Sequence, residues 1–149
     1  MAFSQSSLKG RALRLLSGRE HSRAELERKL KRFEEEPGIL AKALDELQAK
    51  GFIDEQRVVD SVLHRRAAKL GAARVQQELT AKGLPREAIR DAVAVLQATE
   101  LERAREVWQK KFGAPPADAS ERGKQQRFLA ARGFAAEAIR RVVSGGAED

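Results

Sequence analysis

The chain has 149 residues, of which 34% are charged and 5% aromatic, and it contains no cysteine. Disulfides, zinc–thiolate sites and a cysteine nucleophile are therefore excluded. A chain without cysteine is expected in the reducing cytoplasm. Neither a signal peptide in residues 1–8 nor a run of roughly 20 apolar residues is present, so no membrane partner is expected. The net charge of +7 favours acidic partners, nucleic acids among them.

Short helices are predicted along the whole chain, because helix-forming residues dominate and apolar residues recur three and four positions apart. In chain order these positions are Leu26, Leu30 and Phe33; Leu40, Leu44 and Leu47; Val59, Val62 and Leu63; Val75 and Leu79; Ile89, Val93 and Leu96; Leu101, Ala104 and Trp108; Phe128 and Leu129; and Ile139, Val142 and Val143. Ser22 and Asp118 each precede a glutamate by three positions, as helix-starting residues do. About nine helices and an all-α fold follow.

The second and third parts of the chain repeat one another. A shift of 50 positions places Leu79 on Leu129, Gly83 on Gly133 and residues 87–90 on the identical residues 137–140. A weaker match relates the first part to the second. We therefore predict three tandem three-helix repeats at residues 8–53, 54–97 and 98–145, with flexible tails at 1–7 and 146–149. Units of this size need packing against neighbouring units for stability, so an elongated, curved and monomeric array is expected.

Basic charge recurs in the first two helices of each repeat. Residues 9–33 carry nine basic and three acidic side chains, residues 34–63 carry three and eight, and residues 64–90 carry seven and two. A solvated helix face explains most single cations, and Lys82 and Arg132 suit the negative end of a helix dipole. Cations in or near first turns oppose the dipole, so helix stability gives no reason for them. These cations are Arg23, Arg74, Arg86, Arg122 and Lys124.

The candidates for contact with an acidic partner such as DNA are Arg23, Arg65, Arg66, Lys69, Arg74, Arg86, Arg122, Lys124 and Arg127. Lys110 and Lys111 add local charge, but the sequence shows no groove around them.

No catalytic residue, metal site or cofactor is predicted. His21 and His64 lack a partner at catalytic or metal-binding spacing, and both are expected at the surface. The acidic runs at residues 34–36 and 54–55 fit helix ends better than a metal site. Trp108 lies on an apolar stripe and is predicted to pack in the core rather than stack on a base.

The order of motifs resembles that of the RecX family, bacterial regulators of the RecA recombinase, over about residues 8–143. The residues that carry the resemblance are Ala12-Leu13, Leu15-Leu16-Ser17, Arg19, His21-Ser22-Arg23, Glu25-Leu26 and Lys29-Leu30; Gly51-Phe52-Ile53-Asp54-Glu55, Arg65-Arg66, Gly71, Arg74-Val75, Glu78-Leu79 and Lys82-Gly83-Leu84; and Phe128-Leu129, Arg132-Gly133-Phe134 and Glu137-Ala138-Ile139. Val58-Val59 stands where the family commonly has an aromatic–alanine pair.

The resemblance implies a crescent of three three-helix repeats. It also implies binding in the groove of a RecA–DNA filament, with effects on ATP hydrolysis, co-protease action and strand exchange. Two other functions stay open at this point. Three-helix units with basic first turns also suit a direct DNA-binding protein of the helix-turn-helix type. An enzyme acting on nucleic acid would have to work without the usual catalytic groups.

Overall fold

A computed structural model describes residues 7–145, and in that range the chain forms nine α-helices and one short 3-10 helix, with no strand. The first repeat contains α1 (Leu8–Gly18), α2 (Arg23–Leu30), the 3-10 helix η2 (Lys31–Phe33) and α3 (Ile39–Ala49). The second contains α4 (Glu55–Arg66), α5 (Ala72–Ala81) and α6 (Arg86–Ala98), and the third contains α7 (Glu100–Lys111), α8 (Ala119–Ala131) and α9 (Ala136–Val143).

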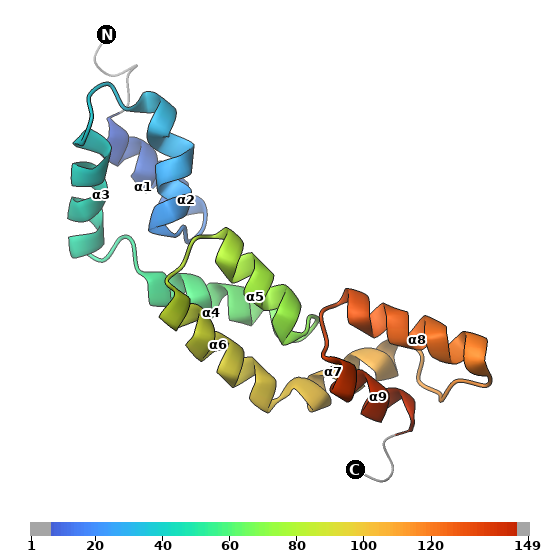
Figure 1. The fold of residues 1–149 in the computed structure, drawn as a ribbon. Coiled ribbons are helices and arrows are strands. Elements are labelled where there is room, and N and C mark those ends of the chain that lie inside the picture. The colour runs from blue at the N-terminus through green and yellow to red at the C-terminus, as the bar shows by residue number, and fades with distance from the viewer. Residues whose placement is uncertain (1–6, 146–149) are drawn as a thin grey trace.

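The three repeats follow one another along an elongated, bent array (Figure 1). This confirms the predicted all-α fold of tandem three-helix units. Residues 1–6 and 146–149 of the predicted tails lie outside the described residues. Ser7, predicted to be in the first tail, is instead the N-cap of α1, and its side chain accepts a hydrogen bond from the Gly10 N–H.

Helix starts follow the predicted capping signals. Ser22 and Glu25 form a reciprocal capping box at the start of α2. Asp118 accepts the Glu121 N–H at the start of α8, and Asp54 accepts the Arg57 N–H at the start of α4. Each cap satisfies a backbone donor that the helix itself leaves unpaired, so these acidic and hydroxyl side chains are explained by local structure.

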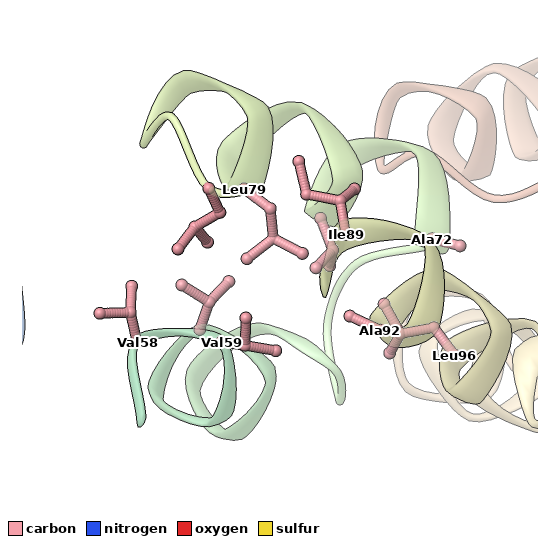
Figure 2. Close-up of a cluster of buried hydrophobic side chains, with 10 residues drawn as sticks. Val58, Val59, Ala72, Leu79, Ile89, Ala92 and Leu96 are labelled. Atoms are coloured by element: carbon pink, nitrogen blue, oxygen red, sulfur yellow. The ribbon is translucent and has the colours of Figure 1, made fainter. Parts of the chain in front are cut away.

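Each repeat has its own hydrophobic core. In the second repeat, α4 contributes Val58 and Val59, which are 1% and 2% exposed, and they face Leu79 of α5 and Ile89 of α6 (Figure 2). Val58 and Val59 therefore both lie in the core of the second repeat. In the third repeat Trp108 is buried in the core, as predicted.

The repeats are joined through their middle helices, α2, α5 and α8, which lie along one side of the array (Figure 1). At the first joint, the Ser22 hydroxyl at the start of α2 donates to the Lys82 carbonyl at the end of α5. At the second joint, the Gly71 N–H at the start of α5 donates to the Arg132 carbonyl at the end of α8, at 2.8 Å. In both joints the negative end of one helix dipole meets the positive end of the next.

Close backbone approach at the joints explains the repeated glycines. A Cβ atom on Gly83 would lie 2.5 Å from the Cβ of Ala24, and one on Gly133 would lie 2.3 Å from the Cγ of Arg74. Both glycines also have positive φ, at 71° and 88°. The Gly83 and Gly133 that aligned in the sequence therefore occupy equivalent places in the two joints, and a side chain at either position would push two repeats apart.

Candidate functional site

The first joint contains a buried carboxylate. Glu25 is 7% exposed and lies between Arg19 of its own repeat, at 2.8 Å, and Lys82 of the second repeat, at 3.5 Å. Burial by itself raises the pKa of Glu25, but hydrogen bonds from Arg19 and the Ser22 N–H, with the charge of Lys82, outweigh burial and lower it to about 2. Glu25 therefore stays ionised and links the first two repeats.

His21 lies beside this carboxylate and is 2% exposed, so its predicted surface position is wrong, whereas His64 is exposed as expected. The imidazole lies 3.1 Å from the Arg19 carbonyl through Nδ1 and 3.0 Å from the Lys29 ammonium through Nε2. A carbonyl can only accept and an ammonium can only donate, so His21 is the neutral Nδ1–H tautomer. Burial lowers its pKa, and the charges of Arg19 and Lys29 act in the same direction.

We expect the protein to lose stability as the pH falls through 6.5, the ordinary pKa of histidine. The unfolded His21 takes up a proton near its ordinary pKa of 6.5, whereas the folded protein holds its pKa lower. The unfolded state then binds more protons, so the free energy of unfolding decreases on acidification. Urea denaturation at several pH values should show this slope in the wild type and in His64→Gln, and a smaller one in His21→Gln. Equal slopes in all three proteins would contradict the assignment.

The second joint is clamped by Glu100, at the start of α7. This side chain is 8% exposed, and it accepts the Ala72 N–H of the second repeat at 3.0 Å and the Ala135 N–H of the third repeat at 2.9 Å. Arg103 donates to Glu100 at 3.1 Å and to the Ala67 and Leu70 carbonyls at 2.8 and 2.6 Å. Backbone groups from both repeats thus depend on one charged pair.

Four of the predicted contact residues form ion pairs or hydrogen bonds with other residues of the protein. Arg23 joins α2 to α3 through Asp45 at 2.7 Å, and Arg74 donates to the Ala131 carbonyl across the second joint at 2.6 Å. Arg65 and Arg66 both pair with Glu78 of α5, at 3.4 and 3.1 Å. The prediction that stability gives no reason for Arg23 and Arg74 is wrong, because it weighed only the dipole of their own helix and their partners lie on other helices.

The other five predicted contact residues are exposed, and among the described residues their side chains have no hydrogen-bond or ion-pair partner. They are Lys69 before α5, Arg86 on α6, and Arg122, Lys124 and Arg127 on α8. These cations remain available to a partner.

The second and third repeats also enclose a cleft of about 440 Å³ beside their joint, which we call the basic cleft. Its lining includes five cations, and no acidic residue lines it. The lining residues are Arg66, Ala68, Lys69 and Leu70 of the second repeat and Val107, Lys110, Lys111, Phe128 and Arg132 of the third. The groove around Lys110 and Lys111 that the sequence could not show is thus formed by two repeats meeting.

Arg132 was explained from sequence by the dipole at the end of α8, but the structure gives it a second role. Its guanidinium lies 4.1 Å from the centre of the Phe128 ring, and the Lys111 ammonium lies 5.4 Å from the same centre. Phe128 and Arg132 are four residues apart on one helix face, and this spacing is the sequence signal that could have pointed to the pair.

Within residues 7–145 there is no group of three or more His, Asp or Glu side chains placed to hold a metal ion. None of the helices described is both long and apolar enough to cross a membrane.

The fold and the joints define a class of protein, an array of tandem three-helix repeats. Three family models match the chain in order. Residues 9–47 match "RecX, first three-helix domain", residues 54–93 match "RecX, second three-helix domain", and residues 98–143 match "RecX, third three-helix domain". A protein of Leptothrix cholodnii named regulatory protein RecX is 54% identical over 139 residues, covering 93% of this chain and 88% of the relative. Another of that name, from Chromobacterium violaceum, is 44% identical and covers 100% and 97%. The chain belongs to the RecX family.

Solved structures share the fold at low sequence identity. The crystal structure of RecX from Lactobacillus salivarius has a TM-score of 0.75 at 18% identity and covers 92% of both chains. A crystal structure of regulatory protein RecX has a TM-score of 0.73 at 20% identity, covering 92% of this chain and 71% of the other. The three-repeat architecture is therefore common to proteins whose sequences have diverged widely.

Proposed function

We propose that this protein binds the RecA–DNA filament, inhibits its ATPase, co-protease and strand-exchange activities, and catalyses no reaction itself. Its partners are the filament protein and the DNA within the filament, and it acts as a monomer in the cytoplasm. The observation that carries the proposal is a bent array of three bonded repeats, with a basic cleft between two of them, in a chain of the RecX family.

The shape and bonding of the array suit this role. The units proposed at residues 8–53, 54–97 and 98–145 are tied by hydrogen bonds at both joints, so they can present several contact sites in fixed relation. A ligand that touches several subunits of a polymer gains avidity that a single small domain lacks. Such a ligand shifts the polymer between states by its difference in affinity for them, so no catalytic group is needed.

The proposal predicts that the protein co-sediments with RecA filaments and lowers their rate of ATP hydrolysis several-fold. Naked DNA of the same length serves as the control, at several salt concentrations. A helix-turn-helix DNA-binding protein should bind naked duplex as tightly as filament and lose affinity steeply with salt. Equal affinity for both, with ATP hydrolysis unchanged, would contradict the regulator and favour direct DNA binding.

A further inference from the structure

We propose that the basic cleft binds the phosphodiester backbone of a DNA strand, so that the joint between the second and third repeats is a direct nucleic-acid contact. This inference deepens the proposed function and rests on it for the setting in which the strand is met. Within the filament, the cleft would hold DNA while other surfaces of the array contact protein.

The excess of positive charge in the cleft favours binding of an anion. Five cations line one cleft of about 440 Å³, and no carboxylate lines it with them. Like charges at this density repel one another, so a multivalent anion entering the cleft relieves repulsion as well as gaining attraction. Arg66 is the only one of the five with a carboxylate partner among the described residues, namely Glu78.

Two lysines are the most available ligands. Lys69 and Lys110 are exposed, one from each repeat, and within residues 7–145 neither side chain has a hydrogen-bond or ion-pair partner. A long, flexible lysine with three donors can follow phosphate oxygens without a fixed geometry. Because one lysine comes from each repeat, the site is complete only when the joint is formed.

The surroundings of Phe128 favour the backbone of the strand over its bases. Arg132 and Lys111 both contact the ring by cation–π interaction, and Phe112 packs edge-on against it at 5.3 Å between ring centres. A ring with these neighbours holds cations in place and is not free to stack on a base. The Arg132 guanidinium is thereby pre-oriented for a phosphate oxygen.

One further cation extends the positive charge of the cleft along α8. Lys124, Phe128 and Arg132 follow one another at intervals of four, so they lie along one helix face, with the two cations about 12 Å apart along the axis. Lys124 is exposed and extends the charge beyond the cleft. Two cations aligned along one helix complement a linear polyanion such as a DNA strand, whose phosphates repeat at regular intervals.

The test uses the full-length protein and a short fluorescein-labelled single-stranded oligonucleotide without recombinase, with binding followed by fluorescence anisotropy. The variant Lys69→Gln/Lys110→Gln should raise the dissociation constant about tenfold or more and lower the slope of log affinity against log salt by about one to two. The matched control Lys42→Gln/Lys50→Gln removes two exposed lysines from α3 and its C-cap and should leave both unchanged. Circular dichroism checks that both variants are folded.

The proposal is overturned if the wild type does not bind the oligonucleotide, if the two variants lose affinity equally, or if the cleft variant binds as the wild type does. Co-sedimentation with RecA filaments is scored separately. Loss of filament binding with normal oligonucleotide binding would assign the cleft to an acidic protein surface and leave the proposed function standing. Loss of oligonucleotide binding in a protein that ignores filaments would support the cleft and refute the proposed function.

Discussion

Replacing Gly71 by alanine is expected to force the second and third repeats apart. The new Cβ would lie 2.3 Å from the Gly133 oxygen, 2.4 Å from its carbonyl carbon and 2.5 Å from the Phe134 nitrogen. All three are backbone atoms, so no side chain can rotate away. The joint must open, which also weakens the hydrogen bond from the Gly71 N–H to the Arg132 carbonyl at 2.8 Å. We expect a loss of about 3 kcal/mol in the free energy of unfolding.

Urea denaturation measures this loss, and small-angle X-ray scattering detects the altered angle between the repeats. Gly18→Ala is the matched control, because Gly18 ends α1 and a Cβ there would meet nothing within 4 Å. Its stability should change by less than about 1 kcal/mol. If Gly71→Ala is as stable as Gly18→Ala and scatters as the wild type does, the close contact at the joint is wrong.

Truncation of Glu100 to alanine is expected to have a comparable or larger effect. It removes the acceptor of the Ala72 and Ala135 N–H groups and leaves the Arg103 guanidinium, which is 12% exposed, without its carboxylate. An unpaired buried charge and two orphaned donors cost about 3–5 kcal/mol. Thermal or urea unfolding followed by circular dichroism would report the loss.

Glu102→Ala provides the comparison, since Glu102 is an exposed acidic residue in the same first turn of α7. It loses only a favourable helix-dipole interaction, about 0.3–1 kcal/mol. Similar destabilisation by the two substitutions would mean that Glu100 does not clamp the repeats. A large effect confined to Glu100→Ala would identify the second joint as a major contributor to the stability of the array.

The helices were predictable because their signals are local. The capping residues Ser22 and Asp118 act within one turn, and apolar spacing along each helix marks the face that becomes buried. The repeat of Gly83 at Gly133 also revealed that two units share one design. The neighbours of these two glycines could not be predicted from spacing, because each lies in the preceding repeat. Gly83 contacts Ala24, and Gly133 contacts Arg74.

The candidate contact residues were predicted less well, for the same reason. Arg23 and Arg74 looked unexplained while only their own helices were considered, yet both have partners on other helices. His21 is expected at the surface from sequence because it has no partner at catalytic or metal-binding spacing and comes just before a helix cap. It is buried in the structure, where the second repeat packs against the start of α2. Arg132 was assigned only to its helix end, although it also lines the basic cleft.

The sequence by itself determined that this protein is a series of three-helix units with an excess of basic charge, because hydrophobic periodicity, capping and net charge depend on residues close together in the chain. Only the tertiary structure decided which cations bond one repeat to the next and which line a cleft. Those outcomes depend on contacts between residues about 60 positions apart in the chain, such as Ser22 and Lys82, and no local pattern encodes them.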